Sequence, residues 1–542
     1  MIVAEAVGRA LAGLGVDTVF GVVGSGNFHV TNALVAAGAR YIAARHEGGA
    51  ATMADAYART GGGLGVLSVH QGPGLTNAMT GIAEAAKSRT PLLVLAGEAT
   101  EAASNFHIDQ AAMVAAVGAV AARVRSAESA VADAAAAARL ALRERRTVLL
   151  NLPLDVQAQP VRQADPPAPG PAPESAPPCP EQVAALAEAL AAARRPVFVA
   201  GRGARHARDA LTALADRAGA LPATSAVAKG LFRGDPWDLD VSGGFASPLA
   251  AELIRGADLL VSWGCALNMW TTRHGALIGP RTTLVQVDIE RDAIGRHRAV
   301  DLGVVGDVRE TATLTAARLP EIRPGYRSPG LAERIEREVR WRDVPYKDAG
   351  GDGRIDPRTL TAELDDVLPR ERVVAVDSGN FMGYPSMYLS VPDERGFCFT
   401  QAFQAVGLGL ATAIGAALAQ PDRLPVAALG DGGALMGIAE LETVVRLGLP
   451  MVIVVYDDEA YGAEVHHFGP DGHPLATVTF PPADLAAIAR GHGCAAVTVR
   501  EPADIAAVAE WVTGPRDRPL LVHAKIAPGP AAWWLEEAFR GH

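Results

Sequence analysis

The sequence predicts an α/β protein with three doubly wound parallel-sheet domains. Short runs rich in valine, leucine and isoleucine alternate with helical segments along the chain, which is typical of parallel strands covered on both faces. These runs fall into three blocks, and a proline-rich stretch separates the first two. With 542 residues, of which 49% are hydrophobic, the chain is long enough for roughly three domains with buried cores.

The first block covers residues 1–158, and its expected strands are Thr18–Val22, Val66–Val69, Leu92–Ala96 and Val148–Leu152. Residues 159–180 are expected to form a surface linker, because proline removes backbone donors and disfavours helices. The central block covers residues 181–330, with expected strands Val197–Ala200, Leu259–Trp263 and Leu284–Asp288. The third block covers residues 350–542, with expected strands Val373–Val376, Pro425–Leu429, Met451–Tyr456 and Leu520–Ala524.

Composition excludes several classes of function. The net charge of −11 comes with no basic stripe, so we expect no nucleic-acid partner. No signal-peptide pattern and no uncharged apolar run of membrane-spanning length is present, so we expect no membrane segment. The four cysteines are scattered, which favours neither disulfides nor zinc and fits a cytoplasmic location.

The most informative stretch runs from Gly430 to Gly462. A strand ends in Gly430-Asp431-Gly432-Gly433, an apolar helix follows, and a second strand ends in Asp457-Asp458. A parallel β-α-β unit would bring Asp431 and Asp458 side by side. Glycines let the backbone approach a phosphate, and acidic side chains beside a phosphate require a cation between them. Mg²⁺ fits, because it prefers carboxylate, carbonyl, water and phosphate oxygens.

This spacing resembles the signature of the thiamine-diphosphate family that includes acetolactate synthase and the 2-oxoacid decarboxylases. The resemblance implies that Asp431, Asp458 and the backbone carbonyl of Ala460 bind Mg²⁺. The chain carries aspartate at 457 and 458 where asparagine is common, which adds negative charge that Mg²⁺ can compensate.

A second segment, residues 43–60, resembles the family's catalytic-glutamate helix and places Glu47 at the matching position. Small residues on the following turns indicate close packing around it. We therefore expect a buried carboxyl with a raised pKa that shares a proton with the aminopyrimidine ring of the cofactor. The alternative is a surface glutamate that compensates the helix dipole.

The resemblance also implies an architecture. The three blocks correspond to pyrimidine-binding, central and diphosphate-binding domains, and the cofactor is held between the third block and the first block of a partner subunit. A homodimer is then the minimum active unit, and a homotetramer is expected.

Further cofactor contacts follow from the resemblance. Val406 matches the residue under the thiazolium that enforces the bent cofactor, although a core role is the alternative. Gly379 and Asn380 lie where the family contacts the diphosphate or the pyrimidine. The remaining expected cofactor contacts are Gly430, Gly432, Gly433 and Tyr461.

Polar residues of the first block are candidates for directing the reaction. Ser25 and His70 match two active-site residues of benzoylformate decarboxylase, and His70 precedes a glycine turn at a strand end, where side chains face a site in open α/β folds. A structural histidine is the alternative. Thr271 stands where that enzyme uses a central-domain histidine. Gln110 resembles a residue of benzaldehyde lyase and acetolactate synthase that reaches toward the bound intermediate.

His466 and His467 lie in a segment expected to form a loop and short helix over the entrance. They are candidate substrate contacts, and solvated surface histidines are the alternative.

The preferred function is a thiamine-diphosphate- and Mg²⁺-dependent carboligase that forms a carbanion/enamine from a 2-oxoacid and joins it to a second carbonyl, as in acetolactate synthase. A non-ligating 2-oxoacid decarboxylase is the alternative, and His70 favours it. A flavin-dependent oxidase of the same fold is a further alternative. FAD is possible but not supported, because Gly201–Gly203 and Asp288 form only a weak nucleotide pattern.

Overall fold

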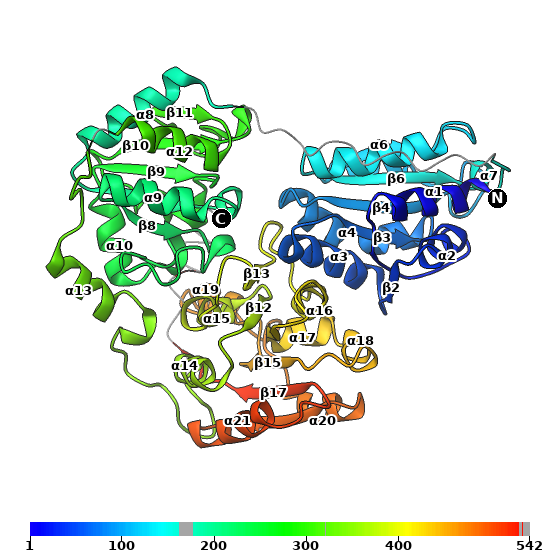
Figure 1. The fold of residues 1–542 in the computed structure, drawn as a ribbon. Coiled ribbons are helices and arrows are strands. Elements are labelled where there is room, and N and C mark those ends of the chain that lie inside the picture. Colours follow the sequence, from blue (N-terminus) through cyan, green and yellow to red (C-terminus); the bar gives the residue numbers. More distant parts are fainter. Residues whose placement is uncertain (162–176, 320, 530–533, 535–542) are drawn as a thin grey trace.

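The computed structural model describes residues 1–161, 177–319, 321–529 and 534. It contains three sheets in which the paired strands are parallel, and helices cover both faces (Figure 1). The predicted fold class is therefore confirmed. We name the three units the N-terminal domain (β1–β6), the central domain (β7–β11) and the C-terminal domain (β12–β17). None of the helices in the described residues is long and apolar enough to cross a membrane.

The N-terminal domain has a six-stranded sheet with the order β2-β1-β3-β4-β6-β5. Its strands are β1 (Thr18–Gly21), β2 (Arg40–Ala43), β3 (Gly65–Val69), β4 (Leu92–Glu98), β5 (Val120–Arg123) and β6 (Thr147–Pro153). Its helices are α1 (Val3–Gly13), α2 (Phe28–Ala36), α3 (Glu47–Gly61), α4 (Pro73–Lys87), α5 (Gln110–Ala116), α6 (Ala130–Arg143) and α7 (Leu154–Gln157).

The central domain has a five-stranded sheet with the order β11-β10-β9-β7-β8. Its strands are β7 (Pro196–Ala200), β8 (Leu221–Thr224), β9 (Leu259–Trp263), β10 (Thr283–Asp288) and β11 (Leu302–Val305). Its α-helices are α8 (Pro180–Ala192), α9 (Arg208–Ala218), α10 (Pro248–Arg255), α11 (Met269–Thr272) and α12 (Val308–Arg318), and α13 (Pro329–Glu338) follows.

The C-terminal domain has a six-stranded sheet with the order β13-β12-β14-β15-β17-β16. Its strands are β12 (Arg372–Val376), β13 (Phe397–Phe399), β14 (Leu424–Gly430), β15 (Val452–Asp457), β16 (Ala495–Val499) and β17 (Leu520–Lys525). Its α-helices are α14 (Pro357–Val367), α15 (Gly383–Tyr388), α16 (Gly409–Ala419), α17 (Asp431–Met436), α18 (Glu440–Arg446), α19 (Gly462–Phe468), α20 (Leu485–Gly491) and α21 (Ala506–Thr513).

The expected strands all coincide with interior strands of the three sheets, to within two residues at each end. The strands that the sequence did not predict are β2, β5, β8, β11, β13 and β16, which are the two edges of each sheet. Most edge strands are partly exposed, as in β5 with its alternating exposure, so they lack a continuous apolar run. These segments are strands because they form hydrogen bonds to a neighbouring strand, and such pairing cannot be recognised from the sequence alone.

The structure also bears on the expected helix between β14 and β15 and on the expected linker. The segment between β14 and β15 was expected to be one apolar helix, but residues 437–439 separate α17 from α18. Of the expected linker, residues 162–176 lie outside the described residues. At its two ends, Pro160 pairs with Ile2 in an isolated bridge, and α8 begins at Pro180. The exact domain boundaries stay a prediction.

The glycines that hinted at a nucleotide pattern have a packing role in the central domain. A Cβ on Gly201 would lie 2.4 Å from the carbonyl oxygen of Gly264, and one on Gly203 would lie 2.9 Å from the Gly264 Cα. The amide of Gly203 donates to that same carbonyl at 3.0 Å. Close approach of two strand ends therefore accounts for these glycines without a bound flavin.

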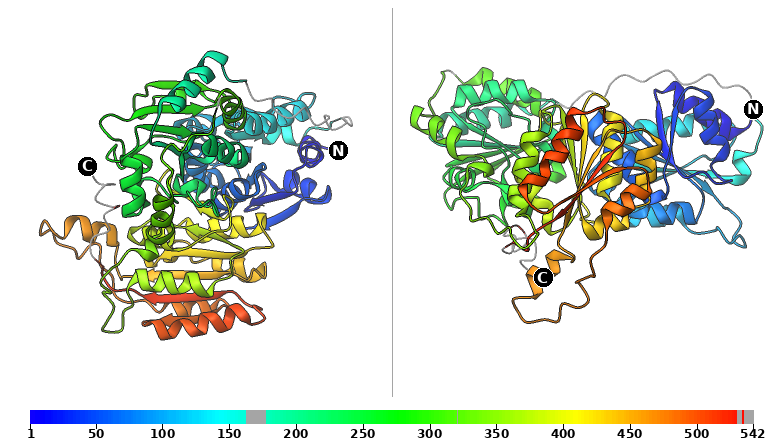
Figure 2. Two further views of the ribbon diagram at one scale, coloured as in Figure 1. Left: turned by 60° about the vertical axis from the view of Figure 1, so that its left-hand side comes forward. Right: turned by 90° about the horizontal axis from the view of Figure 1, so that it is seen from below.

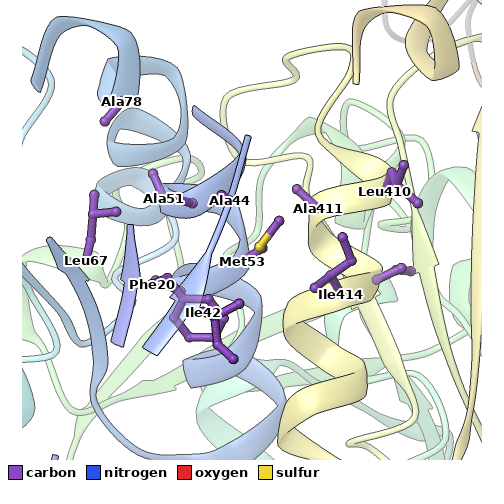
Figure 3. Close-up of a cluster of buried hydrophobic side chains, with 14 of the residues drawn as sticks. Phe20, Ile42, Ala44, Ala51, Met53, Leu67, Ala78, Leu410, Ala411 and Ile414 are labelled. Atoms are coloured by element: carbon purple, nitrogen blue, oxygen red, sulfur yellow. The ribbon is translucent and has the colours of Figure 1, made fainter. Parts of the chain in front are cut away.

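The N-terminal and C-terminal domains share one hydrophobic core. Helix α3 packs against α16, and fully buried Met53 and Ile414 belong to the same apolar cluster (Figure 3). Helix α3 is rich in alanine and is capped by Gly62, whose φ of +83° allows the left-handed conformation that closes the helix. The two helices approach so closely that a Cβ on Gly415 would lie 2.1 Å from the carbonyl oxygen of Met53. The relative position of the two domains thus depends on a glycine contact.

We expect Gly415→Ala to destabilise the protein, because the added methyl group meets backbone and the helices must separate. Overpacking of this kind costs about 1–3 kcal/mol, which exceeds the gain of about 1 kcal/mol in helix propensity. Thermal unfolding followed by calorimetry measures the change.

Gly61→Ala is the matched control at the same helix pair. An added Cβ there meets only the Ala419 side chain, at 3.4 Å, which is ordinary contact. Equal unfolding temperatures for the two variants would contradict the close-packing argument.

Candidate active site

The two acidic motifs meet at one edge of the C-terminal sheet. Strands β14 and β15 pair in parallel, with Gly430 opposite Tyr456. Asp431 directly follows Gly430, and Asp458 directly follows the end of β15 at Asp457. The strand register therefore brings both aspartates to the carboxyl edge of the sheet, where ligands bind in open α/β folds.

The charges of these aspartates disfavour each other in the absence of a cation. Burial, followed by the charges of Asp458 and Asp457, raises the pKa of Asp431 to about 7. Burial raises the pKa of Asp458 to about 6, and Asp457 contributes, although the Ala460 amide opposes the shift. Within the described ranges, no group of three or more His, Cys, Asp or Glu side chains is arranged to hold a metal. A cation at this edge would take its other ligands from backbone, water or phosphate, as Mg²⁺ does.

Asp457, the position where the chain departs from the usual asparagine, has its own counter-charges. Its carboxylate accepts from the Lys525 ammonium at 2.6 Å and lies 2.5 Å from His523 Nε2, both on β17. Burial alone would raise the pKa of Asp457, but these two partners lower it. His523 and Lys525 therefore stabilise the additional carboxylate of Asp457 next to the site.

The glycine turn is packed tightly from two sides. A Cβ on Gly433 would lie 2.4 Å from Asp377 Oδ2 and 3.2 Å from Val406 Cγ1, and one on Gly432 would lie 2.7 Å from the Tyr461 ring. Val406 is 41% exposed, so the alternative that it is a core residue is wrong for the single chain. Val406 instead stands beside the turn that carries Asp431.

Gly379 and Asn380 follow β12 and reach the same place. Gly379 has a φ of +142°, which favours glycine, and the buried Asn380 donates toward Asp458. Gly462 packs against both side chains, since a Cβ there would lie 2.2 Å from Asp458 Oδ2. The Asn380 Oδ1 atom is buried without a hydrogen-bond partner. An orphaned polar atom at the carboxyl edge fits a bound ligand.

Ala460 and Tyr461 follow Asp458 in an isolated bridge with the segment around Thr479. The bonds of this bridge join Phe480 N to the Glu459 carbonyl and Tyr461 N to the Val478 carbonyl. The bridge therefore does not use the Ala460 carbonyl, which is the group expected to bind the metal.

Asp377 is a residue of the candidate site that the sequence analysis missed. Asp377 is fully buried and directly follows β12. Its carboxylate accepts from the backbone amides of Gly407 and Leu408 at 3.0–3.2 Å. Burial raises the pKa of Asp377 to about 6 despite these donors. The position of Asp377 directly after a buried strand could have indicated a site residue. The amides that it binds lie about thirty residues away in the sequence, so the sequence does not show the contact.

In the N-terminal domain, Glu47 begins α3 and is only partly buried. The expectation of a buried carboxyl is therefore wrong for the single chain. Glu47 Oε2 accepts from the Asn77 side chain of α4 at 3.1 Å. Among the hydrogen bonds and ion pairs of the described residues, none joins Glu47 or His70 to Asp431 or Asp458.

Ser25 and His70 lie together, with 3.3 Å between Ser25 Oγ and His70 Nε2. His70 Nδ1 is 2.8 Å from the Gln71 carbonyl, which can only accept, so Nδ1 carries a proton. With the proton on Nδ1, Nε2 of the neutral tautomer can accept from the Ser25 hydroxyl. Asn27 holds the loop that carries Ser25, because its Oδ1 accepts from the Gly24 amide at 2.8 Å.

Gln110 and Thr271 are buried and used internally. Gln110 donates to the Gly97 carbonyl and to Asn151 Oδ1, and it accepts from the Gly72 amide, so both donors are occupied. Thr271 donates to Asn268 Oδ1 inside the central domain. These bonds hold both side chains in place, and the expected roles of Gln110 and Thr271 at the site stay predictions.

His466 and His467 lie on the short helix α19, in the orange segment that projects from the C-terminal domain (Figure 2). Both side chains are partly buried, so the fully solvated alternative does not describe them. Burial lowers the pKa of His466.

Comparisons with known proteins agree with this arrangement. Three family profiles match: "Thiamine pyrophosphate enzyme, N-terminal TPP binding domain" at residues 1–117, the family's central domain at residues 183–316, and its C-terminal TPP binding domain at residues 377–524.

Several curated proteins are similar over most of their length. The probable 2-ketoarginine decarboxylase AruI of Pseudomonas aeruginosa is 33% identical, covering 92% of this chain and 89% of that protein. The acetolactate synthase large subunit of Parasynechococcus marenigrum is 30% identical, covering 85% and 76%. A sulfoacetaldehyde acetyltransferase of Castellaniella defragrans is 28% identical, covering 85% and 81%. Since the profiles for TPP binding match both the domain with Glu47 and the domain with the paired aspartates, the chain belongs to the thiamine pyrophosphate enzyme family and is a thiamine-pyrophosphate-dependent enzyme.

Proposed function

We propose that the protein is a thiamine-diphosphate- and Mg²⁺-dependent carboligase that acts on a 2-oxoacid and joins it to a second carbonyl compound, similar to acetolactate synthase. The observation that carries this proposal is the pair Asp431 and Asp458 at adjoining strand ends. Their raised pKa values mark a site where negative charge is costly until a cation binds.

The residues present fit the cofactor. Asp431, Asp458 and the Ala460 carbonyl would hold Mg²⁺, and Gly430, Gly432 and Gly433 would contact the diphosphate. Gly379 and Asn380 would contact the diphosphate or the pyrimidine. The glycine turn has no room for a Cβ, and the unpartnered Asn380 Oδ1 is a buried acceptor that suits the metal ion or the amino group of the pyrimidine rather than a phosphate oxygen. Tyr461 and Val406 flank the turn.

When bound, thiamine diphosphate supplies a nucleophilic carbon for the 2-oxoacid carbonyl and an electron sink that lets carbon dioxide leave. Glu47 would hold a proton at the aminopyrimidine ring. Val406 would support the thiazolium ring of the cofactor. Ser25 and His70 would donate or accept protons at the substrate, and His466 and His467 would contact the substrate from α19.

We propose a homodimer as the minimum active unit, because one chain does not join Glu47 to the paired aspartates. A partner subunit would supply the missing half to each site. Exposed apolar side chains near the site support burial by another chain, with Met436 58% exposed and Phe403 44% exposed. A homotetramer built from two such dimers and a cytoplasmic location complete the proposal.

A second candidate is a decarboxylase that releases an aldehyde without ligation. The contact between Ser25 and His70 favours it, because a histidine near the reacting carbon can deliver the final proton. The similarity to AruI, named a probable 2-ketoarginine decarboxylase, agrees with it. The flavin alternative is not favoured by Gly201 and Gly203, whose place is explained by packing.

The direct test is to incubate the purified protein, thiamine diphosphate and Mg²⁺ with single 2-oxoacids and with pairs of oxoacids and aldehydes. Mass spectrometry identifies the products. A 2-hydroxyketone supports the carboligase, whereas an aldehyde alone supports the decarboxylase. Absence of metal-dependent cofactor binding contradicts both.

We expect Glu47→Gln to lower kcat by about 10²–10⁴-fold, the range for loss of a proton-transfer group, while the cofactor still binds. Turnover assays and calorimetric titration with thiamine diphosphate measure the two effects. Glu5→Gln, in the first turn of α1, is the matched control and should leave both unchanged. Normal turnover in Glu47→Gln would remove Glu47 from the site.

We expect Asp431→Asn to stabilise the metal-free protein and to abolish metal-dependent cofactor binding. Because the folded-state pKa is raised to about 7, the folded state retains a proton that the unfolded chain releases near pH 4. The free energy of unfolding of the metal-free protein therefore decreases as pH rises from about 4 to about 7. Asparagine does not ionise, so the variant does not show this decrease. A gain of about 1 kcal/mol would raise Tm at pH 8 by about 1 °C for a chain of 542 residues.

Asp457→Asn provides the control of opposite sign. Its carboxylate bonds Lys525 and His523, so its loss should lower the Tm of the metal-free protein. Parallel shifts in the two variants would show that the aspartates are not distinguished by their surroundings.

We expect His70→Ala to raise the ratio of 2-hydroxyketone to aldehyde, because loss of the proton donor slows aldehyde formation more than capture by a second carbonyl. Ser25→Ala should shift the ratio less and in the same direction. Product ratios from mass spectrometry measure the effect, and an unchanged ratio in His70→Ala would assign the histidine a structural role.

A further inference from the structure

An irregular segment joins β13 to α16, and we call residues 400–408 the Val406 loop. It places Val406 beside the glycine turn, with Cγ1 3.2 Å from where a Gly433 Cβ would stand. The loop has no regular backbone bonding, and Gln404 within it has a φ of +63°. Contacts at its two ends must therefore determine where Val406 lies.

The second end of the loop is fixed by Asp377 of the same domain, which accepts from the amides of Gly407 and Leu408. The first end is bonded within the C-terminal domain, through Thr400 to the Val376 carbonyl and through Ser378 to the Gln401 side chain, and it is also bonded by the N-terminal domain. Glu84 of α4 accepts from the Ala402 amide through Oε1 at 3.1 Å and from the Phe403 amide through Oε2 at 2.7 Å. Both carboxylate oxygens thus bind consecutive backbone amides of the Val406 loop.

Glu84 is itself held rigidly. It is fully buried and forms an ion pair with Arg59 of α3 at 2.7 Å. Arg59 also binds Asp55 and donates to the Phe399 carbonyl at 3.1 Å, at the end of β13. Burial alone would raise the pKa of Glu84, but Arg59 and the two amides lower it. A charged, fixed acceptor therefore faces the loop.

A second contact joins the same helix and loop. The Lys87 ammonium, at the end of α4, lies 5.4 Å from the centre of the Phe403 ring. Asn77 lies about three turns before Lys87 on α4, and its side chain donates to the Glu47 carboxylate. One helix therefore contacts both the proposed catalytic acid and the loop proposed to support the cofactor.

We propose that Glu84 is a positioning residue of the active site: by binding the amides of Ala402 and Phe403, it sets the place of Val406 against the cofactor-binding turn. This inference rests on the proposed function. It deepens that function by giving the N-terminal domain a role in shaping the diphosphate-binding half of its own chain, in addition to supplying Glu47.

The test is Glu84→Gln. The amide retains the shape of the side chain, but its NH₂ group meets a backbone donor where a carboxylate oxygen accepted. Arg59 keeps its pair with Asp55, so the fold should persist. We expect the Kd of thiamine diphosphate with Mg²⁺ to rise about tenfold, measured by titration calorimetry, and kcat to fall about 10–100-fold, as for a misplacement of about 1 Å.

A double-mutant cycle separates positioning from general stability. If Glu84 acts through Val406, Glu84→Gln made in a Val406→Ala background should change Kd by less than about twofold. Equal effects in both backgrounds would overturn the assignment. Glu84→Asp keeps the negative charge on a shorter side chain, so we expect a Kd between those of the wild type and Glu84→Gln. This variant replaces Glu84→Gln in the test if Glu84→Gln does not fold.

Arg395→Ala is the matched control. It removes a bond of 2.9 Å to the Thr60 carbonyl between the same two domains without touching the Val406 loop. We expect its Kd to equal that of the wild type. If the wild type binds no cofactor, the proposed function fails; if it binds and Glu84→Gln behaves like Arg395→Ala, only the role of Glu84 fails.

Discussion

The structure of the site depends on two carboxylates held at the adjoining carboxyl ends of β14 and β15. Each is disfavoured by burial, and a further acid lies immediately behind them. The protein tolerates this arrangement because the strands that carry it are buried, and because Asp457 is bonded to Lys525 and His523. Local repulsion at a functional site is thus maintained by packing and charge pairing in its surroundings.

The shared core of the N-terminal and C-terminal domains has a functional consequence. Helices α3 and α4 carry Glu47 and Asn77 at one end and Arg59 and Glu84 at the other. In the proposed dimer, the first pair serves a partner's cofactor and the second pair holds a loop of its own chain. The close contact of α3 with α16 would then join the geometry of the two sites through rigid helices.

The proposed substrate contacts lie on two parts of the chain. Gln110 and Thr271 form internal hydrogen bonds, and Ser25, His70 and the histidines of α19 are the contacts that we propose. Relatives named as decarboxylase, synthase and acetyltransferase share the fold with this chain. In the proposed function, the difference between aldehyde release and ligation would depend on proton delivery by His70 and on the shape of the pocket.

The sequence by itself determined the interior strands, the three-block order and the spacing of Asp431 and Asp458, because buried parallel strands are continuous apolar runs and the motif is local. Only the tertiary structure decided the edge strands, the break between α17 and α18, the exposure of Glu47, the saturation of Gln110 and the roles of Asp377 and Glu84. Each of these depends on partners that are distant in the sequence. Glu84 shows this most clearly, because the amides it binds lie more than three hundred positions away, in another domain.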